Sequence, residues 1–272
     1  MDLNTVTAVV RPQTREQLPG WTAGDAWLAG GTWLFSEPQT HLARLIDLND
    51  LGWPALTVTD SELQIAATCT VAQLDALPCP PDWIAAPLIN QCSRAFLASF
   101  KIWKTATIGG NLCMSLPAGP MIALTAALDG VCTIWKSDGG AQRVRVADFV
   151  TGNLANVLAP GDLLRQIDIP LAALRRRAAF RQIALTPLGR SGALLIGMLD
   201  GARFVLTVTG ATIRPVQLTF PALPSADDLH DAIMQGIPDA LIHDDVHGKP
   251  EWRRHMTLRL ADEIRAELQG TP

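Results

Sequence analysis

The sequence has no tyrosine, few histidines and few charged residues, and these shortages narrow the kinds of protein it can encode. Tyrosine is absent from all 272 positions, although eight tryptophans are present. The five histidines form no HExxH motif, which disfavours a metal site of that type. Charged residues make up 18% of the chain and the net charge is −4. Because phosphate backbones are bound by concentrated basic faces, this balance argues against a nucleic-acid-binding protein.

The cysteines are scattered, and long hydrophobic runs are missing. Cys69, Cys79, Cys92, Cys113 and Cys132 are odd in number and form no CxxC pair, so neither a disulfide framework nor a ferredoxin-type cluster is indicated. We expect reduced thiols in the cytoplasm. No apolar run reaches the roughly 18–20 residues of a membrane helix. The N-terminal residues also lack the basic start and apolar core of a signal peptide.

Hydrophobic residues are nevertheless abundant, at 48% of the chain with a mean hydropathy of +0.19. Either a dense core or a surface buried against a partner explains this composition. Short strands and helices alternate in the first part of the chain. Strands are expected in AWLAG, ARLIDL, LQIAATCT and LLRQIDIP, helices in VAQLDAL, DWIAAPLINQCSRAF and PMIALTAALDG, and a hairpin around SDGG.

The pattern changes after Pro170. Segments rich in β-branched residues with turn signals predict a meander, and Ser225 with two following acids marks the start of a helix. A last helix is predicted over residues 250–269, because apolar residues recur every four positions. We therefore expect two domains, residues 1–170 and residues 171–272.

Two small-residue loops are the main chemical signal. WLAGGTWLF covers residues 27–35 and TIGGN covers residues 107–111. Glycine allows a ligand to approach the backbone, and backbone N–H groups or helix N-termini bind pyrophosphate. Asn111 adds an amide donor. Neither loop fits the GxGxxG or GxxxxGK[ST] nucleotide motifs, and each loop taken alone could be a tight turn.

Other candidate motifs point to no chemistry. HDDVH at residues 243–247 is interpreted as an exposed turn before the last helix, and GRSGA at residues 189–193 lacks the GxSxG pattern of a nucleophile elbow. No pair of carboxylates is spaced as an acid and a base. Such an absence is compatible with a protein whose cofactor carries the chemistry.

The loops belong to an ordered series. LAGGT, LIDLND, LQIAATCTVAQL, TATIGGN, RVRVADFVTG and PGDLLRQIDIP follow one another at spacings that resemble the FAD-binding (medium) subunit of the molybdenum hydroxylases. That family includes xanthine dehydrogenase, carbon monoxide dehydrogenase and related aldehyde or N-heterocycle oxidoreductases. The segment DDVHGKPEWRRHM resembles its C-terminal part. The resemblance spans nearly the whole chain.

The resemblance implies an α+β fold. A FAD-binding domain of the vanillyl-alcohol-oxidase (PCMH) type, with two lobes divided near residue 55, would be followed by a smaller α+β domain. The FAD pyrophosphate would lie on the two glycine loops. Leu97 would lie near the flavin and Leu164 near the adenine, while Arg181 takes the place of a family lysine. The implied FAD contacts are Leu28, Ala29, Gly30, Gly31, Thr32, Trp33, Leu34, Phe35, Leu97, Thr107, Ile108, Gly109, Gly110, Asn111, Ser115, Leu164 and Arg181.

Three positions depart from the family pattern. Trp33 stands where an aspartate is usual after AGGT, Pro120 stands where an acid is usual, and residues 102–104 read IWK instead of IRN. The acid would contact a hydroxyl or ribityl oxygen. Its loss predicts weaker FAD binding.

The resemblance implies a cytoplasmic oxidoreductase subunit of a heterotrimer, with no catalytic or metal-binding residue of its own. Electrons would pass from a large molybdopterin subunit through a small [2Fe–2S] subunit to FAD and then to an acceptor such as NAD or a quinone. A flavin-poor structural or assembly subunit of the same type of complex is the alternative, favoured by Trp33 and Pro120. A free-standing flavoenzyme would need a catalytic acid or base, which the sequence does not show.

Overall fold

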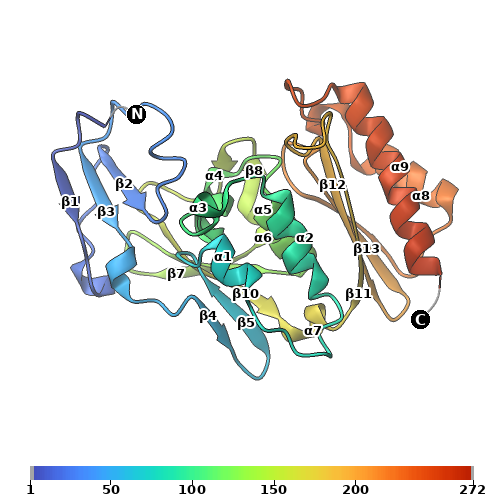
Figure 1. Cartoon of the computed structure of the whole chain (residues 1–272), viewed down its shortest axis with the longest axis horizontal. Coiled ribbons are helices and arrows are strands. Elements are labelled where there is room, and N and C mark those ends of the chain that lie inside the picture. The colour runs from blue at the N-terminus through green and yellow to red at the C-terminus, as the bar shows by residue number, and fades with distance from the viewer. Residues whose placement is uncertain (1–2, 271–272) are drawn as a thin grey trace.

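The computed structural model describes residues 3–270. Three sheets follow one another along the chain, with helices α4 and α5 between the first and the third (Figure 1). Within residues 3–270, no helix combines the length and the apolar character needed to cross a bilayer.

The first sheet is small and parallel, in the order β1-β3-β2. Ile46 of β3 is fully buried, and the buried carboxylate of Asp25 in β2 accepts two bonds from Arg44 of β3, one of them from Nε at 2.7 Å. This ion pair and the β3 core fix the strand that leads into the first glycine loop. The strands are β1 (Ala8–Val10), β2 (Asp25–Leu28) and β3 (Arg44–Asp47), with short 3-10 turns at Arg15–Gln17 and Asn49–Leu51.

The second sheet has the strand order β4-β5-β10-β6-β7, and every neighbouring pair is antiparallel. The predicted SDGG turn joins β6 to β7, and Gly139 adopts the positive φ of +90° that the turn requires. Its strands are β4 (Leu56–Val58), β5 (Glu62–Ala66), β6 (Val131–Trp135), β7 (Ala141–Arg145) and β10 (Leu163–Pro170), with β8 (Val150–Gly152) and β9 (Ala155–Asn156) as a separate pair.

Tryptophans join the first sheet to the second. Trp53 and Trp135 meet edge to face at 5.5 Å between ring centroids. The Arg165 guanidinium lies 4.3 Å from the Trp53 ring centroid, within the range of a cation–π contact. Trp27 of β2 packs in the same cluster and donates its indole N–H to the Asp162 carbonyl at 2.9 Å. The first sheet is thereby held against the ends of β6 and β10 in the second sheet.

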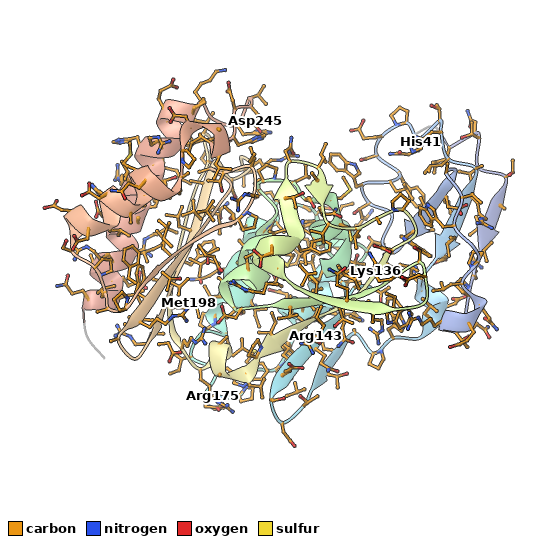
Figure 2. All side chains as sticks on the ribbon, turned by 180° about the vertical axis from the view of Figure 1, so that it is seen from behind. His41, Lys136, Arg143, Arg175, Met198 and Asp245 are labelled. Carbon is orange, nitrogen blue, oxygen red and sulfur yellow. The ribbon has the colours of Figure 1, made fainter. Side chains whose placement is uncertain are left out.

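Helices cover the second sheet and fill the space beside the third. In α5 all eight residues are buried, so this helix is apolar on every face. It packs against α2, β12 and β13, and Met198 of β12 belongs to the same core (Figure 2). The helices are α1 (Val71–Asp75), α2 (Pro87–Ala95), α3 (Phe100–Trp103), α4 (Ile108–Met114), α5 (Pro120–Ala127), α6 (Val146–Phe149) and α7 (Leu171–Leu174).

The third sheet is the predicted meander, with successive antiparallel strands β11 (Arg177–Ile183), β12 (Ala193–Asp200), β13 (Arg203–Thr209) and β14 (Val216–Phe220). One face is covered by α9 (Pro250–Gln269), whose four-residue apolar stripe is buried as predicted. α8 (Ala226–Gly236) begins at Ser225, which accepts the Asp228 N–H as a cap, and a 3-10 turn follows at Asp239–Leu241.

One local prediction was wrong. Residues 107–111 were expected to form a loop, but Thr107 is the N-cap of α4 and residues 108–111 are its first turn. The Thr107 hydroxyl accepts the Gly110 N–H at 3.0 Å, and a capping side chain of this kind outweighs the poor helix propensity of two glycines. The division into domains at residue 170, and into lobes near residue 55, stays a prediction.

Candidate functional site

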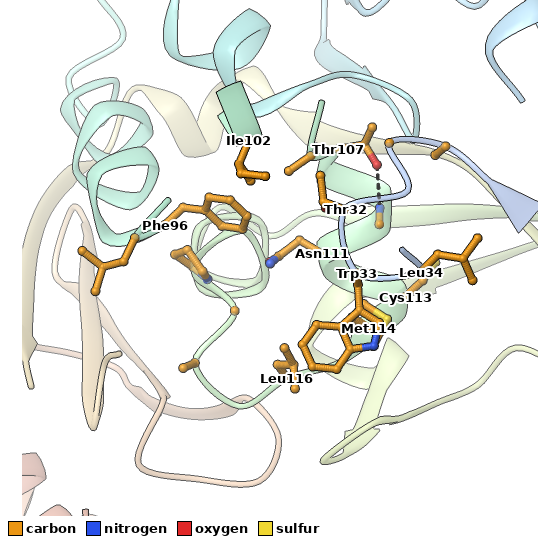
Figure 3. Close-up of a pocket in the computed structure, with 18 of the residues that line it drawn as sticks. Thr32, Trp33, Leu34, Phe96, Ile102, Thr107, Asn111, Cys113, Met114 and Leu116 are labelled. Atoms are coloured by element: carbon orange, nitrogen blue, oxygen red, sulfur yellow. Dashed lines mark hydrogen bonds between the residues drawn. The ribbon is translucent and has the colours of Figure 1, made fainter. Parts of the chain in front are cut away.

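A cavity of about 630 Å³ lies where the first lobe, the α4–α5 region and the third sheet meet (Figure 3). This volume is in the range of small-molecule and cofactor sites, which is roughly 300–1,000 Å³. Its lining is Trp27, Ala29, Gly30, Gly31, Thr32, Trp33, Leu34, Ala95, Phe96, Leu97, Ile102, Ala106, Thr107, Gly110, Asn111, Cys113, Met114, Leu116, Ala118, Gly119, Pro120, Leu188, Arg190 and His247.

The first glycine segment is shaped by contact with the chain just before α4. A Cβ on Gly30 would lie 1.8 Å from the carbonyl oxygen of Thr105, so any side chain at this position would clash with the backbone. Gly31 has a φ of +67°, and a Cβ there would lie 2.5 Å from the Phe35 ring. The glycines therefore let two backbone segments touch and let the loop turn sharply at the cavity wall.

This loop offers a row of free donors. Phe35 donates to the Gly31 carbonyl at 2.8 Å, which closes one turn. The backbone N–H groups of residues 30–34 donate to no acceptor within residues 3–270. All five of these residues line the cavity. Consecutive backbone N–H groups without protein acceptors are the usual donors to an anion such as pyrophosphate.

The second glycine segment is different, because its donors are already used. The N–H groups of Ile108 and Gly109 donate to the carbonyls of Cys69 and Ala67 at 2.8 and 3.0 Å. Those of Gly110 and Asn111 donate to Thr107, to its hydroxyl and its carbonyl. The start of α4 is thus pinned to the chain that follows β5, and its N–H groups are not spare.

The two glycines of this segment lack a side chain for different structural reasons. A Cβ on Gly109 would lie 2.5 Å from the Cβ of Ala67, so this glycine allows α4 to pack against the chain beneath it. A Cβ on Gly110 would come close only to the Thr107 hydroxyl oxygen, at 2.8 Å, and Gly110 itself lines the cavity. We had expected both glycines to admit a ligand, and only Gly110 is placed to do so.

Asn111 links α4 to α5 and still offers a donor. Its side-chain oxygen accepts the Met121 N–H at 3.2 Å, which satisfies a donor in the first turn of α5. Its Nδ2 donates to no acceptor within residues 3–270, and the side chain points into the cavity (Figure 3). Pro120, beside it, is the first residue of α5 and lines the cavity, where it contributes neither charge nor a donor.

The C-terminal part of the chain supplies the remaining wall. Leu188 and Arg190 come from the β11–β12 connection, and His247 comes from the turn before α9. Within residues 3–270, Arg190 is the one permanently charged side chain in the lining, and no carboxylate joins it. Burial raises the pKa of the Cys113 thiol to about 12, so this lining group stays neutral and protonated.

The predicted contacts fall into two groups. Loop residues 29–34, Leu97, Thr107, Gly110 and Asn111 line the cavity. The others lie elsewhere: Leu28, Phe35, Ile108 and Gly109 adjoin it in sequence, Ser115 is a buried C-cap of α4, and Leu164 is a buried core residue paired with Ile134. Arg181 is held by Glu263 and Glu267 of α9, at 3.0 and 2.7 Å.

The other lining residues, Pro120 aside, were not predicted as contacts. They are Trp27, Ala95, Phe96, Ile102, Ala106, Cys113, Met114, Leu116, Ala118, Gly119, Leu188, Arg190 and His247. Most are apolar, and their patterns are those of core positions. HDDVH was interpreted as an exposed turn, and its structure is a turn, yet His247 reaches the cavity from it. Only the packing of the third sheet against α5 brings this turn to the wall.

The cavity fits an elongated, partly anionic cofactor. Its free N–H groups suit phosphate oxygens, while its indole, phenyl and aliphatic walls suit a flat ring system. Gly110 has no side chain, which leaves the space beside the Thr107 hydroxyl free. These are observations on the chain itself and favour the FAD that the sequence implied.

Residues 6–172 match the family described as FAD binding domain in molybdopterin dehydrogenase. Caffeine dehydrogenase subunit beta of Pseudomonas sp. is 34% identical over 134 residues, 46% of this chain and 45% of that protein. Carbon monoxide dehydrogenase medium chain of Afipia carboxidovorans is 28% identical over 193 residues, 68% of this chain and 65% of that protein. The matched stretches span less than two thirds of either relative.

Solved structures share the fold over almost the whole chain. Quinoline 2-oxidoreductase from Pseudomonas putida 86 matches with a TM-score of 0.77 at 16% identity, covering 98% of both chains. Reconstituted CO dehydrogenase from Oligotropha carboxidovorans matches with a TM-score of 0.78 at 22% identity, covering 95% of this chain and 97% of that one. The predicted α+β fold class is confirmed.

Proposed function

Because the chain belongs to the family of FAD-binding domains in molybdopterin dehydrogenases, we propose that it is the electron-transfer subunit that carries FAD between a partner and an external acceptor. Its cofactor is FAD and its class is oxidoreductase. The proposed partners are a small [2Fe–2S] subunit and a large molybdopterin subunit in a cytoplasmic heterotrimer. The proposed acceptor is a small molecule such as NAD or a quinone.

The first glycine loop would hold the pyrophosphate. Residues 30–34 line the cavity, and their five N–H groups donate to no acceptor within residues 3–270; this observation carries the proposal. Backbone donors held in a fixed loop lose little freedom when the ligand binds. The second segment would take a supporting part: Thr107 and Gly110 bound the space, and the Asn111 amide offers one more donor.

The chain supplies binding and orientation, and FAD, when bound, supplies the ability to take up and release electrons. Apolar side chains of Phe96, Leu97, Ile102 and Leu116 would exclude water from the ring system. Within residues 3–270 the lining holds no aspartate or glutamate, and besides Arg190 its titratable side chains are Cys113 and His247. An apolar lining with backbone donors supports the proposal that this site holds FAD.

A flavin-poor structural or assembly subunit is the second candidate. Trp33 and Pro120 both line the cavity, where the family usually has acids. Figure 3 shows the Trp33 side chain among the residues that line the cavity. A large side chain at this place reduces the room for a ligand, which is the observation that favours this candidate.

The decisive experiment is a flavin titration of the purified full chain. We expect one non-covalent FAD per chain, released by acid and identified as FAD, with tighter binding of FAD than of FMN. FMN is the matched control ligand because it lacks the pyrophosphate and the adenosine. Equal binding of both would contradict the role of the N–H loop, and no binding of FAD after reconstitution would favour the flavin-poor candidate.

The proposed assembly has its own test. Three large apolar side chains are exposed, those of Leu97, Phe100 and Leu188. Exposed apolar side chains of this kind favour binding to a partner subunit. Purification from the native source should yield a complex that contains iron, sulfide and molybdenum. Recovery of the chain as a monomer with full dehydrogenase activity would contradict the proposed heterotrimer.

A further inference from the structure

We propose that Arg190 stabilises the negative charge that FAD acquires on reduction, and thereby raises the reduction potential of the bound cofactor. This inference rests on the proposed binding of FAD in the cavity. It assigns a function to the third sheet, whose β11–β12 connection carries Arg190 to the cavity wall.

The charges around the cavity single out this residue. Within residues 3–270, the lining contains Arg190 as a permanent cation and no aspartate or glutamate. Nor does Arg190 form an ion pair or a side-chain hydrogen bond with any described residue, unlike Arg181 on the preceding strand, which is paired with Glu263 and Glu267. The guanidinium is therefore available to a ligand.

The connection that carries Arg190 is anchored on both sides. On the N-terminal side, the Gly189 N–H donates to the Thr186 carbonyl at 2.9 Å, which closes a turn. On the C-terminal side, the buried Ser191 hydroxyl accepts a bond from Gln182 at 2.9 Å. Although the Arg190 side chain is exposed, its backbone is fixed next to the cavity.

A buried arginine completes the anchoring. Arg253 of α9 is 1% exposed and donates to the carbonyls of Gly192 and Gly248, at 2.6 and 2.8 Å, and to that of Gly210. It also bonds Asp245, labelled in Figure 2. Arg253 thus ties the strand after Arg190 to the turn that holds His247, so that both reach the same wall.

The opposite wall is already supplied with donors for phosphate. The N–H groups of residues 30–34 belong to the first lobe, whereas Arg190 belongs to the third sheet, and α4 and α5 lie between these parts (Figure 1). An elongated FAD with its pyrophosphate on the N–H loop would direct its ring system toward α5 and the third sheet. Arg190, the one permanent cation of the lining within residues 3–270, would then lie on the side of the cavity that holds the ring system.

The charge change is that of ordinary flavin chemistry. Two electrons and one proton convert the neutral oxidised ring into a reduced ring with one negative charge, shared by N1 and the neighbouring carbonyl. A cation near that group stabilises the reduced form more than the oxidised form. Solvent screens part of this effect because Arg190 is exposed, but within residues 3–270 no carboxylate in the lining opposes it.

The test is a redox titration of the FAD-loaded full chain with dithionite, in the presence of an indicator dye. In R190Q we expect reduced FAD to lose about tenfold more affinity than oxidised FAD. For a two-electron couple a tenfold difference lowers the potential by about 30 mV. R190K keeps a positive charge and should recover most of the potential. The matched control is R203Q, at the exposed start of β13 beyond the other end of β12 and outside the cavity lining, which should leave the potential unchanged.

The outcomes separate this inference from the proposed function. A potential in R190Q equal to that of the unsubstituted chain overturns the inference. Equal weakening of both FAD forms also overturns it, because Arg190 would then contact the phosphates. Failure of the unsubstituted chain to bind FAD refutes the proposed function itself. Circular dichroism and the R190K titration distinguish a folding defect from a loss of charge.

Discussion

Replacing Gly30 with alanine tests whether contact between the two glycine segments shapes the pyrophosphate site. The added Cβ would lie 1.8 Å from the Thr105 carbonyl oxygen and 2.7 Å from its carbon. Real Cβ atoms stay at least 3.0 Å from such atoms, so the segments must separate by at least 3.0 − 1.8 = 1.2 Å. Since N–H···O bonds are confined to a window of roughly 0.5 Å, the donors of the loop would leave their positions.

The size of the effect follows from the number of bonds lost. Hydrogen bonds to a charged group contribute about 1.5–3 kcal/mol each. If two of the five N–H bonds are lost in Gly30→Ala, FAD binding weakens by about 3–6 kcal/mol, or roughly 10²- to 10⁴-fold. The measurement is the FAD titration of the full chain, followed by flavin fluorescence, with urea unfolding as the check on folding.

The chain offers a matched control in the same lobe. A Cβ on Gly20 would meet no atom within 4 Å, so Gly20→Ala should keep the FAD affinity unchanged. Its effect on folding should be neutral or slightly stabilising, since alanine restricts the unfolded chain. FAD affinity in Gly30→Ala equal to that in Gly20→Ala would refute the reasoning, because the loop would then tolerate separation from Thr105.

Three further changes test other parts of the structure. Arg253→Met should lower the free energy of unfolding by about 3–5 kcal/mol, because it removes the donor of the half-buried Asp245 and of three carbonyls. Arg254→Met, beside it, should cost only about 1 kcal/mol in the same urea titration. The bond from Arg44 holds the pKa of Asp25 below its ordinary 3.8, so the stability it gives is complete above pH 3.8 and is lost as the pH falls toward the folded pKa. Unfolding measured from about pH 5 down to about pH 2.5 should show this loss, and an Asp25→Asn variant with an unaltered acid transition would contradict it. Pro120→Asp restores a carboxylate at the first turn of α5 and should tighten FAD binding by about 2- to 150-fold in a fluorescence titration. Pro120→Ala is the control and should not tighten binding. Equal or weaker binding in the aspartate variant would show that a carboxylate at this position does not contribute to FAD binding.

Local signals predicted the elements that position the cavity. The last helix was predicted at Pro250–Gln269 and forms there, because an apolar stripe of this kind needs only one neighbouring surface. The SDGG hairpin and the proline-initiated α5 were also found as predicted, since turn and first-turn preferences depend on a few adjacent residues. The order of the small-residue motifs carried the family resemblance, which the family match confirmed.

The cavity wall was predicted well only where it is contiguous in sequence. Loop residues 29–34 were all found in the lining, because one loop after one strand places them together. The two glycines of the second segment look alike in sequence, yet Gly109 packs on Ala67 and Gly110 borders the cavity. Successive residues of a helix point about 100° apart, and which of them faces the cavity depends on where the helix is packed.

Most of the elements and the first loop could be predicted from the amino-acid order, because periodicity, caps and turns act between residues close in the chain. Tertiary structure alone decided that Leu164 and Arg181 lie away from the cavity, while Arg190 and His247 reach it. Arg190 is some 160 positions from the first loop, and the two are brought to one cavity by the burial of α5 between sheets and by the bonds of buried Arg253. Those contacts depend on shape and burial across the whole fold, and no neighbouring residues in the sequence encode them.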